Sequence, residues 1–146
     1  MKKFFLVFAF VSAVCLVNAQ LRKIPAEVTD AFAQRYPHAT HVEWKDKLQY
    51  FEASFELNGS QISADFSSNG DWESSERVMD FEDLPDEVQD GFAKSKYAEW
   101  EKKSVYEVQD LGKPLQYKLI IAKSGLQKKI LVFDANGKLL REAITL

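Results

Sequence analysis

Strict alternation of apolar and polar residues marks the middle of the chain. Between residues 50 and 57, Phe51, Ala53, Phe55 and Leu57 fall on one side of an extended chain, and more polar residues fall on the other side. One buried face and one wet face are typical of an antiparallel strand. Asn58-Gly59 follows, and this dipeptide favours a hairpin because both residues tolerate positive φ. We therefore predict a β-hairpin whose return strand ends near Phe66.

A helix is predicted before this hairpin, over residues 24–36. Its apolar residues, which include Val28 and Phe32, recur at helical spacing. Pro25 suits the first helical turn, where its missing N–H would have no partner, and Pro37 ends the helix. Alternating patterns at residues 40–45 and 72–78 predict two more strands. The first half of the chain therefore reads as one helix followed by four antiparallel strands.

The same order of elements is predicted in the second half. A helix opens at Leu84-Pro85, buries Val88, Phe92 and Tyr97, and ends between residues 97 and 100. Gly91 stands where the first helix has an alanine, which costs up to about 1 kcal/mol of helix stability and indicates a close packing contact. The four strands that follow are predicted at residues 104–109, 115–121, 128–133 and after Asn136-Gly137.

Two pairs of segments resemble each other closely. Residues 24–33 match residues 84–93, and residues 66–72 match residues 133–139, where each segment carries an Asn-Gly turn. A motif that returns in the same order indicates an internal repeat. We predict a first repeat at residues 20–80 and a second repeat at residues 81–146, packed into one compact domain.

The strand at residues 128–133 differs from its neighbours because it is apolar on both sides, through Ile130, Leu131 and Val132. A strand of this kind is usually covered on both faces. Two interpretations follow. Either the two repeats pack together or a tail folds over this strand, or the strand contributes to an exposed apolar patch that receives a partner.

The N-terminus has the pattern of a secretory signal peptide. Met1-Lys2-Lys3 is followed by an apolar run of about a dozen residues and then by Asn18-Ala19-Gln20. We predict cleavage after Ala19, so that residues 1–19 are removed and the mature protein is periplasmic or secreted. Cys15 is the only cysteine, and it would be removed with this peptide. The mature chain would then contain no disulfide and no thiolate metal ligand.

Charge argues against nucleic acid as a partner. The full chain has a formal net charge of −3, and removal of Lys2 and Lys3 would change it to −5. Binding to nucleic acid depends on neutralising phosphates with basic residues.

After signal cleavage no apolar run is long enough to cross a membrane, so we expect no membrane partner. The length fits one domain with a substantial core, present as a monomer or a weak dimer.

Several of these motifs resemble one family. Ile-Pro-x-x-Val-x-x-x-Phe-x-x-x-Tyr-Pro at residues 24–37, Val-Glu-Trp at 42–44, Tyr-x-Glu-Ala-x-Phe at 50–55 and Asn-Gly before an aromatic residue are similar to the PepSY-like, or β-lactamase-inhibitor-like, family of exported bacterial proteins. The second half departs from the pattern, since no proline follows Tyr97 and Trp100 lies closer to the helix. The resemblance implies an α+β fold with two helix-plus-four-stranded-antiparallel-sheet units that share a continuous curved sheet, with the helices on one face. By analogy with inhibitor folds it also suggests inhibition of a peptidase or another hydrolase, although fold alone does not fix function.

Residues for catalysis are missing from the pattern. His38 and His41 are the only histidines, and they stand in a loop and at a strand start, without a third residue at metal-ligand spacing. No glycine-rich phosphate loop is present. We therefore predict that the protein is not an enzyme and has no cofactor and no metal site.

The polar side of the sheet is left as the candidate binding surface. It is acidic and aromatic in the first half, and basic and apolar in the second half. We predict that this face holds a protein partner, because aromatic anchors dominate such interfaces. The alternative is a carrier that holds a small apolar or peptide-like ligand in a pocket between the repeats, lined by Trp72, Trp100 or Leu139. The predicted partner-binding residues are Tyr50, Glu52, Ser54, Glu56, Gln116, Lys118 and Ile120.

Overall fold

The computed structural model describes residues 23–145, so the predicted signal peptide and Cys15 lie outside the described residues. Within these residues, two helices, one short 3-10 helix and eight strands follow one another. No helix within the described range is long and apolar enough to cross a membrane. In chain order the elements are α1 (Ala26–Arg35), β1 (Thr40–Asp46), β2 (Tyr50–Leu57), β3 (Ser60–Ser67), β4 (Trp72–Met79), η1 (Phe81–Asp83), α2 (Asp86–Ala93), β5 (Glu101–Asp110), β6 (Gln116–Ser124), β7 (Gln127–Asp134) and β8 (Leu139–Thr145).

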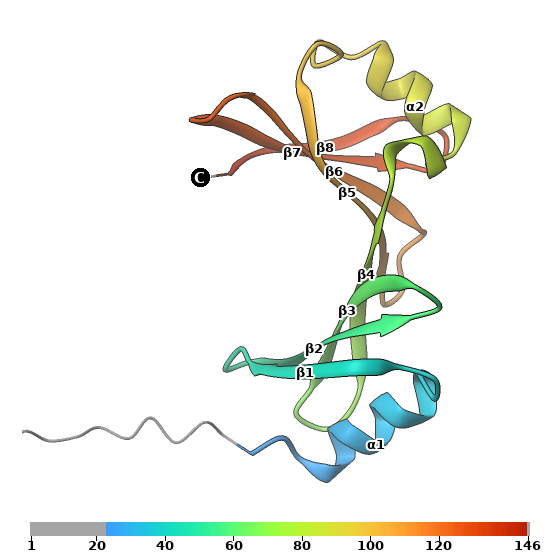
Figure 1. Ribbon diagram of the computed structural model, residues 1–146, viewed down its shortest axis with the longest axis vertical. Coiled ribbons are helices and arrows are strands. Elements are labelled where there is room, and N and C mark those ends of the chain that lie inside the picture. Colours follow the sequence, from blue (N-terminus) through green and yellow to red (C-terminus); the bar gives the residue numbers. More distant parts are fainter. Residues whose placement is uncertain (1–22, 146) are drawn as a thin grey trace, which may run out of the picture.

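All eight strands form one sheet in which every strand pairs antiparallel with the next, from β1 to β8. The register shows that the residues facing α1 and those facing α2 belong to the same face of this sheet. The sheet bends strongly, so that both helices lie on the outside of the bend and the opposite face lines the inside (Figure 1). The predicted α+β class, with an antiparallel curved sheet and helices on one face, is therefore confirmed.

Both helices start as the prolines predict. Pro25 and Pro85 precede α1 and α2 with φ of −62° and −51°, and acidic residues occupy the first turn of each helix. These acids lie at the positive end of the helix dipole. Each helix buries a valine and a phenylalanine one turn apart, Val28 with Phe32 and Val88 with Phe92.

The second helix ends earlier than the sequence suggested. It stops at Ala93, and residues 94–100 continue as turns in which the Ser95 hydroxyl oxygen accepts a hydrogen bond from the Tyr97 N–H at 3.1 Å. Serine favours such local hydrogen bonds over a helix interior. The prediction that Tyr97 is buried is nevertheless confirmed, since only 4% of it is exposed. It reaches the core from a turn and not from the helix.

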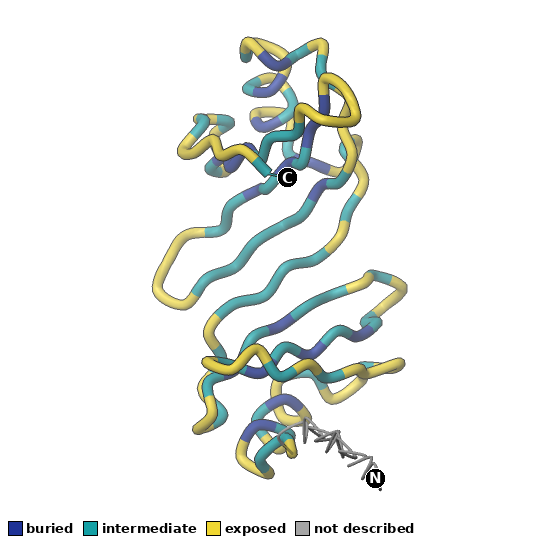
Figure 2. The backbone as a smooth tube through the Cα atoms, turned by 90° about the vertical axis from the view of Figure 1, so that its left-hand side faces the viewer, coloured by how far each residue is buried: buried dark blue, intermediate teal, exposed yellow. Residues whose placement is uncertain are grey.

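Burial is concentrated at the two ends of the molecule, next to the helices, and the middle strands are half-buried (Figure 2). The two groups of buried residues therefore form separate cores on the helix side of one sheet. The N-terminal core contains Val28, Phe32, Phe51, Ala53, Phe55, Ala64 and Phe66. The C-terminal core contains Leu84, Val88, Phe92, Tyr97, Val105, Tyr117, Leu119, Ile121, Leu131 and Phe133.

The strands β4 and β5 join the two ends of the sheet. Six residue pairs align β4 with β5, from Ser74↔Asp110 to Met79↔Val105. On the helix side, the Arg77 guanidinium contacts the Glu107 carboxylate through two nitrogens, each 3.1 Å from an oxygen. Such bidentate pairs combine energy with a fixed geometry. The middle of the molecule is therefore held by the strand ladder and polar contacts, between two apolar cores.

Strand β7 corrects one interpretation of the sequence. Val132 lies on the face opposite the helices and is only 5% exposed, yet no described helix or strand lies over this face (Figure 1). Its cross-strand neighbours are Lys118 on β6 and Arg141 on β8. The stems of such long side chains can cover an apolar neighbour. Covering by the other half of the chain or by a tail, as the first interpretation expected, is not observed in the described residues.

Candidate functional site

The predicted partner-binding residues all lie on the face of the sheet opposite α1 and α2, which we call the open face. Their neighbours in sequence, such as Phe51 on β2 and Leu119 on β6, are buried on the helix side. Because successive side chains of a strand point to opposite faces, the predicted residues point away from the helices. All of them are half-buried: Tyr50, Glu52, Ser54, Glu56, Gln116, Lys118 and Ile120.

The strand register arranges the open face into rows that cross the sheet. Ser54 on β2 and Gln116 on β6 belong to the same row, with three strands between them. At about 4.8 Å per strand, this places them roughly 19 Å apart along the sheet. The predicted residues therefore form two groups and not one compact cluster. The row consists of Glu43, Ser54, Ser63, Glu76, Val108, Gln116 and Asp134.

The residues between these two groups were missed from the sequence. Glu76 on β4 binds the Lys118 ammonium, and the same ammonium lies 4.4 Å from the centre of the Tyr106 ring on β5. This arrangement links both halves of the chain at the middle of the open face. The alternation of residues along β4 indicates that Ser74, Glu76 and Val78 share one face of the sheet. Only the pairing of β4 with β5 shows that this face of β4 lies beside Tyr106.

Asp65 on the open face is a carboxylate with one buried oxygen, Oδ1, that has no hydrogen-bond partner among the described residues. Its Oδ2 accepts a hydrogen bond from the Ser74 hydroxyl at 2.9 Å. Burial raises the pKa of the Asp65 carboxyl, the Ser74 hydrogen bond lowers it, and the nearby charges of Glu52 and Glu76 raise it further. The first half of the open face therefore carries excess negative charge.

Other charges on this half are partly neutralised at the surface. Lys47 and Lys45 approach a Glu52 oxygen at 3.6 and 4.0 Å. His41 lies 3.5 Å from Glu56 beside a bulge between β1 and β2, with the histidine side chain 81% exposed. Exposed pairs of this kind add little to stability. His38 and His41 are both exposed.

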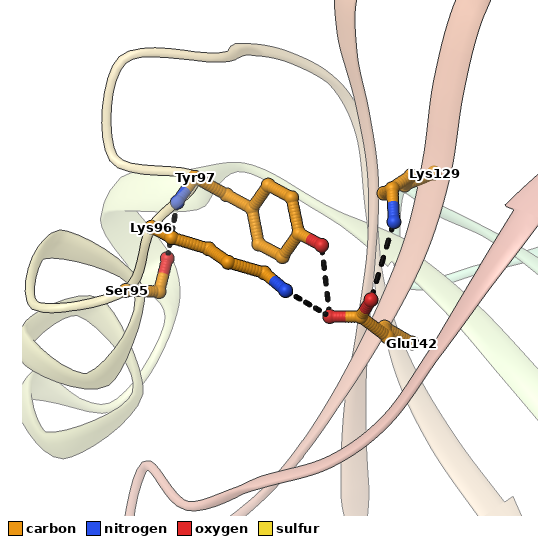
Figure 3. Close-up of polar contacts among 5 residues, drawn as sticks. All are labelled: Ser95, Lys96, Tyr97, Lys129 and Glu142. Atoms are coloured by element: carbon orange, nitrogen blue, oxygen red, sulfur yellow. Dashed lines mark hydrogen bonds and ion pairs between the residues drawn. The ribbon is translucent and has the colours of Figure 1, made fainter.

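A second polar cluster lies on the helix side, next to the end of α2 (Figure 3). The Tyr97 hydroxyl donates to a Glu142 oxygen at 2.8 Å, and Lys129 and Lys96 contact the same carboxylate at 3.2 and 3.4 Å. The Tyr97 hydrogen bond, followed by that of Lys129, lowers the pKa of Glu142. Both carboxylate oxygens have partners, so this cluster ties β8 to the turn after α2. A hollow of about 520 Å³ adjoins it.

The residues of the predicted carrier pocket do not come together. Trp72 packs against the N-terminal core, whereas Trp100 and Leu139 pack against the C-terminal core. The Arg35 guanidinium also stacks 3.9 Å above the Trp72 ring. These side chains therefore complete two separate cores and do not line one pocket between the halves. Within residues 23–145 no group of three histidine, cysteine or acidic residues is placed to hold a metal ion.

Comparison with known proteins identifies relatives of this architecture. The PepSY-like family model, described as putative beta-lactamase-inhibitor-like, matches residues 49–141. A BLIP-like protein from Bacteroides fragilis is 26% identical, with a TM-score of 0.78 over 84% of this chain and 87% of that chain. No curated protein matches the chain.

Two further solved structures share the fold. A protein from Bacteroides eggerthii described as a putative periplasmic protein is 22% identical, with a TM-score of 0.79 over 84% of this chain and 89% of that chain. A DUF2874 family protein from Bacteroides ovatus is 23% identical, with a TM-score of 0.79 over 84% of this chain and 88% of that chain.

Proposed function

The chain belongs to the PepSY-like family, and from this premise we propose that it is an exported, non-catalytic binding module that presents the open face of its sheet to a protein partner. A hydrolase is the partner class that the beta-lactamase-inhibitor-like description of the family favours, and a peptidase is included by analogy with inhibitor folds. The single observation that supports the proposal is the open face itself. It crosses all eight strands without interruption, most of its residues on the middle strands are half-buried, and no described element covers it.

Charge on the open face gives the partner a preferred orientation. Glu52, Asp65 and Glu76 make the first half acidic, whereas Lys128 and Arg141 lie beside Ile130 and Val132 in the second half. Complementary charge steers a partner and fixes its register more than it adds affinity. The half-buried Tyr106 and Ile120 near the middle are the candidate anchors, since aromatic and apolar residues in a central position dominate interface energies.

The two halves are, in this proposal, copies of one unit at residues 20–80 and 81–146. Each half has one helix followed by four strands. In each half, the Asn-Gly turn before the last strand lies against the helix: a Cβ on Gly70 would meet the Glu27 carbonyl oxygen at 2.5 Å, and a Cβ on Gly137 would meet that of Glu87 at 1.9 Å. Glu27 and Glu87 stand at matching positions of the two helix openings. A continuous sheet made of two such units gives the partner a long curved surface.

Export rests on the N-terminal sequence pattern and agrees with the periplasmic description of one structural relative. Expression of the full chain followed by mass spectrometry of the envelope fraction tests it. We expect a mature protein that begins at Gln20. Recovery of the intact chain with Met1 from the cytoplasm would contradict export.

Binding by the open face is tested with a Tyr50→Ala, Ile120→Arg double variant. The wild-type protein and the variant are used to capture partners from envelope extract, and each candidate partner is then purified and its affinity measured. We expect a partner that binds wild type and loses most of its affinity for the variant. The control is Ala93→Arg, which adds the same charge at an exposed position on α2. Equal binding of every partner to all three proteins would exclude the open face.

A further inference from the structure

One corner of the molecule exposes apolar side chains around a hollow. Leu126, in the turn between β6 and β7, is 96% exposed, and Ile144 on β8 is 78% exposed. Together with Trp100 they line a hollow of about 360 Å³. We call it the corner hollow, and its complete lining is Trp100, Leu126, Gln127, Lys128, Lys129 and Ile144.

Strand pairing brings these residues together from separate parts of the chain. Lys129 on β7 pairs with Ile144 on the edge strand β8, and Gln127 pairs with Ser124 across the β6–β7 turn. The tip of the β6–β7 hairpin and the end of β8 lie on the same side of the molecule (Figure 1). Trp100 precedes β5 and packs edge-on against the Tyr97 ring, 5.2 Å between centroids. The indole therefore forms the inner wall, and Leu126 and Ile144 form the outer rim.

Single exposed apolar residues are common on protein surfaces, but convergence of several on one hollow indicates a binding site. Leu111 in the β5–β6 turn provides the contrast. It is 66% exposed but lines none of the hollows described above. A hollow of a few hundred cubic ångströms with a mostly apolar wall and a few charged groups has the size and character of a small-molecule site.

The charged groups around the corner hollow are mainly basic. Lys128 lines it and Lys123 stands on the other side of the turn, and neither forms an ion pair with any residue in the range 23–145. Of the nearby acidic residues, Glu99 beside Trp100 forms no ion pair among residues 23–145, whereas two others are engaged. Glu101 contacts Lys103 at 2.6 Å, and Glu142 is held by Tyr97, Lys96 and Lys129. In a chain of net charge −3, this corner has unpaired positive charge and suits an anionic ligand.

We propose that the corner hollow binds a single-chain anionic amphiphile, an alkyl chain that ends in a carboxylate or a phosphate. The chain lies between Trp100, Leu126 and Ile144, and the anionic end lies near Lys128 and Lys123. Lysine suits this role because its apolar stem can cover the alkyl chain while its ammonium contacts the headgroup. Ile144 and Lys129 lie on the helix side of the sheet, whereas Lys128 belongs to the open face, so the site lies at the edge of the C-terminal half and adjoins the open face.

Titration of the purified chain with dodecanoate, below its critical micelle concentration, tests this site. Indole fluorescence and NMR shifts of the Leu126 and Ile144 methyl groups report binding. We expect saturable binding that Leu126→Ser and Ile144→Ser each weaken about tenfold, a loss of about 1.4 kcal/mol. Both positions are exposed, so folding should be unaffected. Leu111→Ser, the matched control, should bind dodecanoate as wild type does.

Two further ligands separate the contributions of charge and of membrane surfaces. Dodecyl maltoside has the same alkyl chain without the charge, so we expect it to bind more weakly and to be insensitive to Lys128→Gln. Equal affinity for dodecanoate and dodecyl maltoside would overturn the anionic part of the proposal. Absence of saturable dodecanoate binding, or binding that neither Leu126→Ser nor Ile144→Ser weakens, would overturn the site. Leu126-dependent binding to phosphatidylglycerol vesicles without dodecanoate binding would overturn the free amphiphile in favour of a lipid surface.

Discussion

Gly91 on α2 and Gly137 in the β7–β8 turn face each other backbone to backbone. A Cβ on Gly91 would lie 2.1 Å from the carbonyl oxygen of Gly137, which is far inside any real contact. The close packing contact that the sequence suggested at Gly91 is therefore confirmed. Glycine at this position lowers the stability of the helix, but it allows α2 to pack directly against the β7–β8 turn, and this packing offsets the cost.

Gly91→Ala should destabilise the protein although alanine is the better helix former. The added methyl group forces α2 away from the β7–β8 turn, and we expect a loss of about 2 kcal/mol or more in the free energy of unfolding. Urea denaturation measures it. Gly125→Ala is the matched control, because Gly125 has open space around its Cβ position, and we expect a change within about 0.5 kcal/mol. Equal stability of both variants would contradict the contact.

Asp65→Asn should stabilise the protein at neutral pH. The raised pKa of Asp65 means that its protonated form is favoured in the folded state, so its contribution to stability is present at low pH and is lost as pH rises through the folded pKa. Asparagine removes the buried charge and keeps an oxygen that can accept the Ser74 hydrogen bond. We expect a gain of up to about 1 kcal/mol at pH 7, which disappears below the ordinary aspartate pKa.

Thermal unfolding of wild type and Asp65→Asn between pH 3 and pH 8 measures this effect. Asp110→Asn is the control, since Asp110 lies across from Ser74 on the open face but is paired with Lys113 at 2.8 Å. We expect no gain from this substitution. If Asp65→Asn were less stable than wild type at pH 7, the ionised carboxylate would stabilise the folded protein, which would contradict this prediction.

Tyr97→Phe should lower the melting temperature at neutral pH and leave it unchanged in acid. The Tyr97 hydroxyl is the first cause of the lowered pKa of Glu142. A lowered carboxyl pKa contributes stability above the unfolded value, and this contribution is lost as pH falls through the folded pKa. Tyr106→Phe, whose hydroxyl makes no hydrogen bond among the described residues, should show no such pH dependence. A pH-independent effect of Tyr97→Phe would indicate a packing role alone.

Arg77 and Glu107 should be energetically coupled across the junction of β4 and β5. A double-mutant cycle with Arg77→Ala and Glu107→Ala isolates their interaction, and we expect about 1 kcal/mol because the pair is bidentate and half-buried. The hydrogen bond to Glu107 raises the pKa of Arg77, and burial lowers it by less. Arg77 therefore stays protonated from pH 6 to pH 9, and the coupling energy should be constant over this range. The exposed pair Lys103–Glu101 is the control, with a coupling near zero.

Local patterns determined most of the secondary structure. Alternation along residues 50–57 places Phe51, Ala53 and Phe55 in the core, where each is at most 1% exposed. The Asn58-Gly59 turn and the helix openings at Pro25 and Pro85 also stand where the sequence predicts them. These features depend on backbone preferences and on side-chain period, which act over a few residues and can be read without the fold.

Contacts between distant residues could not be read in this way. The end of α2 was misjudged because Tyr97 is buried from a turn. Val132 is buried although no described helix or strand covers it. The meeting of Glu76, Tyr106 and Lys118 and the corner hollow at Trp100, Leu126 and Ile144 depend on which strands pair and in what register. The sequence by itself thus determined which side of each strand is apolar, since that is a local property. Only the tertiary structure decided which side chains meet across the sheet, because curvature and register are set by the packing of the whole chain.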